Sequence, residues 1–315
     1  VLDKIFTNGR MKPQDRPYSG RFAPSPTGPL HFGSLLAATA SYLDAKSHQG
    51  CWIVRMEDVD RDREQPGAAD RILRDLEAFG FEWDGAVVRQ SERAEAYQES
   101  LERLQAAGHV YPCGCSRKEI ADSAIGGAGP AGQFYPGTCK DGLAPGKPAR
   151  SWRVRTGPEP VCFDDRLQGR RCQNVAGTVG DFVLRRADNQ FAYQLAVVVD
   201  DAAQGVTDVV RGADLLDSTP RQIHLQRLLG LPTPRYLHIP VAVDVEGNKL
   251  SKQTRALPID AQDAPRLLCR ALRFLGQAPP AELDGAAVTE VWRWATSAWS
   301  PSRLPAATVL VACPQ

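Results

Sequence analysis

A proline-rich loop near the start of the chain brings a histidine to the beginning of a predicted helix. The sequence RFAPSPTGPLHFGS spans residues 21–34, and a run of small and apolar residues over 33–47 predicts a helix directly after it. The first turn of a helix offers unpaired N–H groups and the positive end of a dipole, both of which favour phosphate. Gly33 would let a ligand approach the backbone, and His31 would add a donor or a cation. The loop therefore predicts a phosphate site, or alternatively a stiff connection with a half-buried histidine.

A second polar loop could supply positive charge to the same ligand. GNKLSKQT, residues 247–254, places Lys249 and Lys252 on either side of Ser251. Taken alone, this stretch is typical of a solvated charged turn. Beside a phosphate site, its lysines would stabilise negative charge that develops on phosphate oxygens.

The cysteines predict a metal site rather than a disulfide framework. The chain has 8 cysteines in 315 residues, too dilute for a small disulfide-stapled domain. Cys113, Cys115 and Cys139 cluster, and Gly114 permits a tight turn between the first two. Three thiolates are three of the four ligands that a structural zinc ion requires. Three buried cysteines without a metal are the alternative.

The fourth ligand stays open at this point. Tyr135, His109, Cys162 and Cys172 are the candidates in the sequence. Ligand chemistry alone favours histidine or cysteine, because a tyrosine must lose a proton whose unperturbed pKa is about 10.

Apolar spacing and turn residues outline an α/β protein with alternating strands and helices. Ser218 or Thr219 can cap one of the helices, with Pro220 in its first turn. We expect helices over 33–47, 67–80, 91–108, 218–230, 263–275 and 287–299. We expect a short strand that begins at Arg21 and further strands in the stretches 51–58, 151–156, 181–186, 191–201 and 205–212. The first strand, helix and strand form a unit typical of a parallel sheet.

Composition excludes some classes of function. A net charge of +1, with 43% hydrophobic and 24% charged residues, argues against indiscriminate binding of nucleic acid, so an RNA partner must meet a local basic surface. No stretch approaches the roughly 18 apolar residues of a membrane span, and residues 1–20 lack the apolar core of a signal peptide. We expect a cytoplasmic protein that does not enter membranes.

The two polar loops together resemble the two signature motifs of the class I aminoacyl-tRNA synthetases. HFGS, residues 31–34, corresponds to the family's His-x-Gly-His motif, and KLSKQ, residues 249–253, to its Lys-Met-Ser-Lys-Ser loop. The resemblance implies activation of an amino acid by ATP with Mg²⁺, with His31 and Lys252 as catalytic residues. Ser34 replaces the second histidine of the first motif. The implied ATP-binding residues are His31, Gly33, Ser34, Lys249, Ser251 and Lys252.

Three longer stretches narrow the resemblance to the glutamyl and glutaminyl branch: residues 21–34, RMEDVDRDR at 55–63, and residues 197–225. Glutamate carries two carboxylates and one ammonium, so its pocket needs an arginine and an acid. We assign Arg21 to the side-chain carboxylate and Glu57 to the ammonium. The implied glutamate-binding residues are Arg21, Phe22, Ala23, Pro24, Ser25, Glu57, Tyr193 and Arg211. Individually, Arg211 could be an ordinary exposed arginine at a strand end, and Glu57 one acid in a charged run.

The same resemblance selects the fourth zinc ligand. Similar proteins bind zinc through Cys-x-Cys followed by Tyr-x-x-x-Cys, and YPGTC matches the second part at Tyr135 and Cys139. The implied structural zinc site is therefore Cys113, Cys115, Tyr135 and Cys139. We expect this insertion to face the acceptor nucleic acid.

The residues after Gln253 indicate which RNA would accept the activated glutamate. Only about 60 residues follow Gln253, whereas full-length glutamyl-tRNA synthetases continue into an anticodon-binding region. The chain therefore resembles a shortened paralogue that transfers glutamate to the queuosine base in the anticodon of tRNA(Asp). The alternatives are a glutamyl-tRNA synthetase that charges tRNA(Glu), another nucleotidyltransferase, and a non-catalytic zinc-containing RNA-binding protein. We expect it to act as a monomer.

This resemblance implies a Rossmann-type nucleotide-binding parallel sheet with an inserted zinc-binding subdomain and a small helical C-terminal part. The expected divisions are 1–20, a flexible N-terminal extension; 21–108, the first half of the catalytic domain; 109–150, the zinc-binding subdomain; 151–240, the acceptor-side region and second half of the catalytic domain; and 241–315, the KLSKQ-type loop and C-terminal helices, without an anticodon-binding domain.

Overall fold

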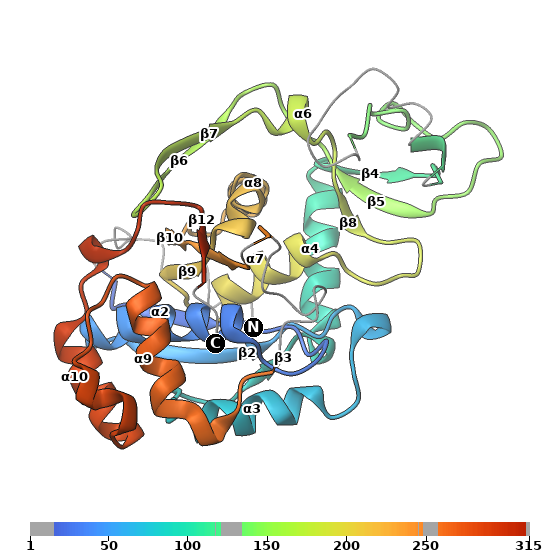
Figure 1. The fold of residues 1–315 in the computed structure, drawn as a ribbon. Helices are drawn as coiled ribbons and strands as arrows, with labels where there is room; N and C mark the ends of the chain where they lie inside the picture. The colour runs from blue at the N-terminus through green and yellow to red at the C-terminus, as the bar shows by residue number, and fades with distance from the viewer. Residues whose placement is uncertain (1–15, 117, 121–133, 245, 248–257, 313–315) are drawn as a thin grey trace.

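A seven-stranded sheet forms the centre of the fold (Figure 1). The computed structural model describes residues 16–116, 118–120, 134–244, 246–247 and 258–312. The strands lie in the order β3-β2-β1-β9-β10-β6-β7, and all pairs except β6–β7 are parallel. Their bounds are Ser19–Phe22 for β1, Cys51–Met56 for β2, Val88–Arg89 for β3, Val161–Asp165 for β6, Gly169–Gln173 for β7, Asp208–Gly212 for β9 and Arg235–Ile239 for β10. The prediction of an α/β fold with a parallel sheet is confirmed.

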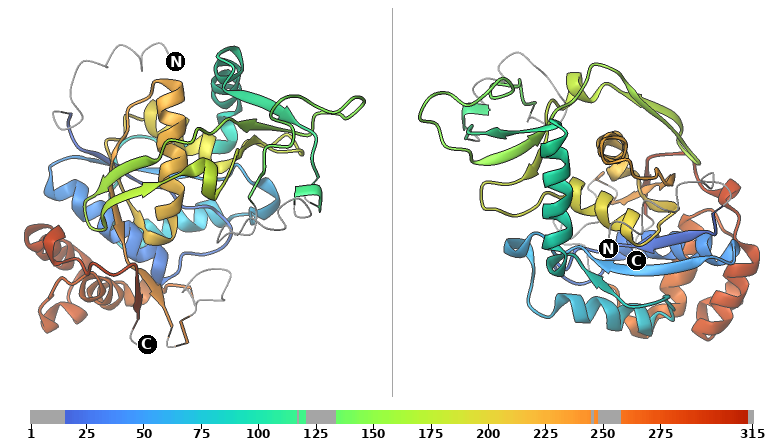
Figure 2. Two further views of the ribbon diagram at one scale, coloured as in Figure 1. Left: turned by 90° about the horizontal axis from the view of Figure 1, so that it is seen from above. Right: turned by 180° about the vertical axis from the view of Figure 1, so that it is seen from behind.

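Helix α2, Phe32–Ser47, connects the first two parallel strands. Ser19 pairs with Cys51 and Phe22 with Val54, as the predicted strand–helix–strand unit requires. The helix is apolar on most sides, because it packs between the sheet and the C-terminal helices α9, Ala264–Phe274, and α10, Val288–Ala298. Figure 2 shows the C-terminal helices, in orange and red, beside α2, and the loop of residues 23–31 links the carboxyl end of β1 to the beginning of α2.

The other predicted helices form within a few residues of their expected limits. They are α3, Ala68–Ala78, α4, Ala94–Ala106, and α8, Thr219–Leu229. Pro220 stands in the first turn of α8, but the predicted side-chain cap is wrong: Ser218 already has helical backbone angles and its Oγ accepts hydrogen bonds from Gln194 and Arg221. The short helix α6, Val175–Thr178, was not predicted.

The strand predicted over residues 191–201 is wrong, because this stretch forms helix α7, Tyr193–Ala203. The apolar run within it is buried on every side, against α4, α8 and β8, Val183–Arg185. A helix without a solvent face has no helical periodicity in its sequence, and β-branched valines then imitate a buried strand. The change places Tyr193 at the beginning of a helix.

The predicted insertion contributes β4 to a separate antiparallel sheet, β4-β5-β8, at one end of the molecule, and β5 and β8 come from the chain that follows the insertion (Figure 1). Strand β4, Val110–Cys113, pairs with β5, Ser151–Val154, across the Gly- and Pro-rich segment. A small core of its own surrounds the cysteines and contains Tyr111, Cys113, Tyr135 and Cys139.

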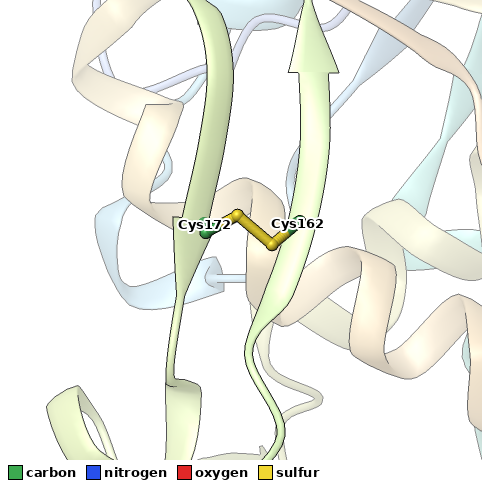
Figure 3. The surroundings of a disulfide bond; sticks show 2 residues. All are labelled: Cys162 and Cys172. Atoms are coloured by element: carbon green, nitrogen blue, oxygen red, sulfur yellow. A yellow bond between two sulfur atoms is a disulfide. The ribbon is translucent and has the colours of Figure 1, made fainter.

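Cys162 and Cys172 form a disulfide across the β6–β7 hairpin (Figure 3). They face each other in the strand register and are ten residues apart in sequence. Their candidacy as zinc ligands is therefore wrong, and the sequence analysis did not foresee this disulfide. The hairpin lies at the edge of the large sheet, away from the predicted zinc site.

Both ends of the described chain belong to the fold. Tyr18 is buried and donates a hydrogen bond of 2.5 Å to Asp44, so ordered structure begins before Arg21; residues 1–15 lie outside the described part. Strand β12, Val309–Val311, pairs in parallel with β11, Val241–Val243. Among the described helices, none has the length and apolar character to cross a membrane.

Candidate active site

A cavity of about 390 Å³ opens at the carboxyl ends of β1, β9 and β10 and at the beginnings of α2 and α7. This edge of a parallel sheet is where α/β proteins bind ligands. The cavity is lined by Arg21, Phe22, Ala23, Pro24, Ser25, Thr27, His31, Gly33, Ser34, Leu36, Ala37, Glu57, Tyr193, Val210, Arg211, Gly212, Asp214, Leu215, Ile239, Pro240, Val241 and Ala242.

His31 caps α2 at one end of the cavity. Its backbone is extended, and its Nδ1 accepts a hydrogen bond of 3.3 Å from the Ser34 N–H. The Ser34 hydroxyl lies 3.1 Å from Nε2 of the same ring. The ring therefore stands over the first turn of the helix, where exposed N–H groups attract anions.

A buried ionic network forms the floor of the cavity. Arg21 Nε donates to Asp201 at 3.3 Å, and Arg55 donates to the same carboxylate oxygen at 2.7 Å. Arg55 also lies 3.4 Å from Glu57. Burial alone would raise the pKa of Asp201, but the two arginines outweigh it and lower that pKa. Asp201 therefore stays ionised and holds Arg21 in place.

Glu57 and Tyr193 line the same cavity beside this network. Burial raises the pKa of Glu57, although Arg55 and Arg21 oppose the shift. Burial also raises the pKa of Tyr193, followed by the charge of Glu57. Tyr193 keeps its phenolic proton, and Glu57 can accept hydrogen bonds from an ammonium group.

Arg211 is buried, 5% exposed, at the end of β9. Its Nε donates to His238 Nε2 at 3.1 Å, and one terminal nitrogen donates to Thr219 and Gln222 at 2.9 Å each. The other terminal nitrogen is buried and makes no hydrogen bond within the described part of the chain. Arg211 is thus not an ordinary surface arginine: it lines the cavity, three side chains hold it in place, and one of its nitrogens has no partner among the described residues.

The structure brings the predicted site residues together. All eight predicted glutamate-binding residues line the cavity, and so do His31, Gly33 and Ser34. The three predicted residues of the second motif, Lys249, Ser251 and Lys252, lie outside the described residues. Sequence reasoning missed Arg55, Asp201 and His238. Their only signal was charge within or directly after apolar runs, CWIVRM, AVVVDD and YLHI.

The predicted metal ligands also converge. The sulfur atoms of Cys113, Cys115 and Cys139 all lie within 4.8 Å of one another. The Tyr135 oxygen lies 3.3 Å from the Cys113 sulfur and 3.8 Å from that of Cys115, whereas His109 is not part of the group. Zinc–sulfur bonds of about 2.3 Å in a tetrahedron separate sulfurs by about 3.8 Å, close to the 3.5 Å between Cys115 and Cys139.

Tyr135 has surroundings that could support a phenolate ligand. Its oxygen accepts a hydrogen bond of 2.9 Å from the Cys139 N–H, and the Arg153 guanidinium lies 3.8 Å from its ring centre. Both favour negative charge on the phenol, but burial and the neighbouring Cys113 outweigh them and raise the pKa of Tyr135. The phenol therefore keeps its proton until a bound cation displaces it. The donor set of three thiols and one phenol therefore fits a borderline-soft cation such as zinc.

Comparison with known proteins defines the class. The model of the family "tRNA synthetases class I (E and Q), catalytic domain" matches residues 19–300, so the chain belongs to this family of ligases. A crystal structure of glutamate-tRNA synthetase from Elizabethkingia anophelis has the same fold, with a TM-score of 0.76 at 23% sequence identity. The superposition covers 93% of this chain and 67% of that one.

Curated relatives give a narrower likeness. A protein of Dechloromonas aromatica is 60% identical over 295 residues, which cover 94% of this chain and 98% of the relative. One of Aromatoleum aromaticum is 58% identical over 289 residues, covering 92% and 91% respectively. Both relatives are named glutamyl-Q tRNA(Asp) synthetase.

Proposed function

We propose that this protein activates glutamate with ATP and transfers it to the queuosine base in the anticodon of tRNA(Asp). The observation that carries the first half, the activation of glutamate, is the cavity in which two buried arginines, an acid and a tyrosine adjoin the N-terminus of α2. The names of relatives up to 60% identical support the second half.

In the activation step, the α-carboxylate of glutamate attacks the α-phosphate of ATP, and pyrophosphate leaves. Catalysis of such a step is mainly positioning and stabilisation of charge on phosphate oxygens. Arg21 would pair with the side-chain carboxylate and Glu57 with the ammonium group, while Tyr193 and Arg211 close the pocket. His31 and the first turn of α2 would hold the phosphates, so that the two reactants meet between β1 and α2.

Lys252 would act on the leaving pyrophosphate, with Lys249 and Ser251 binding ATP and Mg²⁺ neutralising the phosphates. The described chain nearest this loop supports the assignment. Ile259 N–H donates to the Leu30 carbonyl at 3.1 Å, and Pro258 pairs with His31. The chain therefore passes beside His31 only five residues after Gln253.

The remaining parts would serve the RNA. We assign residues 21–108 to the first half of the catalytic domain and residues 151–240 to its second half together with the acceptor-side region. Residues 109–150 would form a zinc-stabilised insertion that faces the anticodon stem-loop, and residues 241–315 the KLSKQ-type loop and its supporting helices. In the transfer step a hydroxyl of the modified base attacks the adenylate carbonyl and releases AMP. The cytoplasm, where tRNA is modified, is the proposed location, and a monomer the proposed state.

ATP–pyrophosphate exchange tests the activation step. Exchange should depend on glutamate and should be at least tenfold weaker with aspartate or glutamine, because these lack either the length or the second carboxylate. A variant Lys252→Ala should lose exchange, whereas Lys46→Ala, on the surface of α2, should retain it. Exchange that is supported equally by other amino acids, or that survives Lys252→Ala, would refute the assignment.

A further inference from the structure

A pair of buried polar side chains, Asp165 and His238, adjoins Arg211 without lining the cavity. His238, on β10, sits next to Arg211 in the parallel register of β9 and β10 and is 0% exposed. Its Nδ1 lies 2.6 Å from the carboxylate of Asp165, which is 4% exposed at the end of β6. Three neighbouring strands thus contribute Asp165, His238 and Arg211 in a row.

The hydrogen bonds fix which ring nitrogen carries the proton. A guanidinium can only donate, so Nε2 of His238 must accept from Arg211 Nε at 3.1 Å. The proton of a neutral ring is then on Nδ1, where the carboxylate of Asp165 accepts it. Burial lowers the pKa of His238, with a further contribution from the Arg211 charge and partial opposition from Asp165. The ring stays neutral and leaves Arg211 as the cation.

Asp165 is itself held in one orientation. Its Oδ1 accepts the backbone N–H groups of Leu167 at 3.0 Å and Gln168 at 2.8 Å. Its Oδ2 accepts the backbone N–H of His238 at 3.2 Å as well as the ring Nδ1. Because both oxygens are engaged, the carboxylate cannot turn away, and it determines the tautomer of His238.

We propose that the Asp165–His238 pair is a positioning device for substrate recognition: it presents an unprotonated ring nitrogen to Arg211 Nε and thereby holds the remaining guanidinium nitrogen toward a glutamate carboxylate. Thr219 and Gln222 hold the other terminal nitrogen. The guanidinium is therefore fixed before glutamate arrives, which reduces the entropy lost on binding. This inference rests on the proposed function, since it assumes that glutamate is the ligand.

Two substitutions at one position separate positioning from simple packing. In His238→Asn the amide can still donate to Asp165, but the acceptor for Arg211 is lost. In His238→Gln the amide oxygen can reach the position of Nε2 and still accept from Arg211. We expect His238→Asn to raise the KM for glutamate in exchange about tenfold, the value of one charge-assisted hydrogen bond, with the KM for ATP unchanged. His238→Gln should lie closer to the wild type, and His48→Asn, at the exposed end of α2, should equal it.

Asp165→Asn tests the tautomer directly. Because the amide oxygen must stay with the two backbone N–H groups, its NH₂ group would face His238 and drive the ring proton to Nε2, against Arg211. We expect the glutamate KM to rise at least as much as in His238→Asn. If the KM for glutamate is unchanged in both Asp165→Asn and His238→Asn, the proposal is overturned.

A measurement on the unaltered protein avoids any dependence on the folding of the variants. Imidazole ¹⁵N spectra of histidine-labelled protein, assigned by the loss of one signal in His238→Gln, should show His238 with Nδ1 protonated and Nε2 bare. A protonated Nε2 would overturn the inference. Failure of the proposed function would look different, because the wild type itself would then show no glutamate-dependent exchange.

Discussion

Replacement of Arg211 by lysine is the perturbation whose effect the structure defines most closely. Lysine keeps the positive charge but has one ammonium in place of a planar fork. In the structure, Arg211 lines the cavity and holds His238, Thr219 and Gln222 with two nitrogens, while the third has no partner among the described residues. An ammonium cannot satisfy these three acceptors and a substrate carboxylate at once, so the variant should lose at least one charge-assisted hydrogen bond to glutamate.

The magnitude follows from the value of that bond. A hydrogen bond to a charged group contributes about 1.5–3 kcal/mol, which corresponds to about a 10- to 150-fold loss of kcat/KM for glutamate. Exchange measured over a range of glutamate concentrations at saturating ATP gives this number. Arg227→Lys, on the exposed side of α8, is the matched control and should behave as the wild type. A folded Arg211→Lys protein with wild-type kcat/KM for glutamate would refute the assignment of Arg211 to the pocket.

Three further predictions concern the metal site, a buried ion pair and the disulfide. Tyr135→Phe should lower zinc affinity at least tenfold in a competition assay with a chelator, since it removes one of four ligands; equal affinity would exclude the phenol. Asp44→Asn should lower the free energy of unfolding by about 2 kcal/mol at pH 7, because it weakens the charge-assisted hydrogen bonds between Asp44 and the partly exposed Arg166. Burial would raise the pKa of Asp44, but Arg166 outweighs it and lowers that pKa in the fold. The stabilisation is therefore present above the unfolded-state pKa of about 3.9 and is lost as the pH falls through the folded-state value. Urea unfolding should show a smaller difference in unfolding free energy between wild type and Asp44→Asn at pH 3 than at pH 7, and an equal difference at both would contradict the prediction. Cys162→Ser should lower the free energy of unfolding by no more than about 2.7 kcal/mol, the loop-closure value for a ring of ten residues. The rate of ATP–pyrophosphate exchange should equal that of the wild type, because the disulfide to Cys172 joins two strands that are already paired in register.

Much of the fold around His31 could be predicted, because the residues that determine it are neighbours in the sequence. The strand, loop and helix around His31 depend on proline, glycine and an apolar run that are contiguous in sequence, and β1, α2 and β2 form where expected. The predicted glutamate-binding residues were identified through the family resemblance, and the structure brings them together around one cavity from four elements of the fold. Periodicity alone could not have joined Arg21 to Arg211, which are distant in sequence and meet only through the order of the sheet.

The failures have a shared physical origin. The run AVVVDD was assigned to a strand because a helix buried on all sides has no polar face to reveal its period. The pair Cys162 and Cys172 was missed because pairing depends on a hairpin register that the sequence does not state. Asp165, His238, Arg55 and Asp201 were missed for a similar reason. Each acts through a partner on another strand or helix, as Arg55 on β2 does with Asp201 on α7, and neither spacing nor composition identifies such distant partners.

The acceptor is the central claim, and one measurement tests it most directly. Radiolabelled glutamate and ATP are offered with tRNA(Asp) that carries queuosine, with the same tRNA lacking queuosine, and with tRNA(Glu). We predict acid-precipitable label on the queuosine-containing tRNA(Asp) alone, in a nuclease fragment that contains the anticodon. Label on tRNA(Glu), or on tRNA(Asp) irrespective of queuosine, would contradict the proposed function.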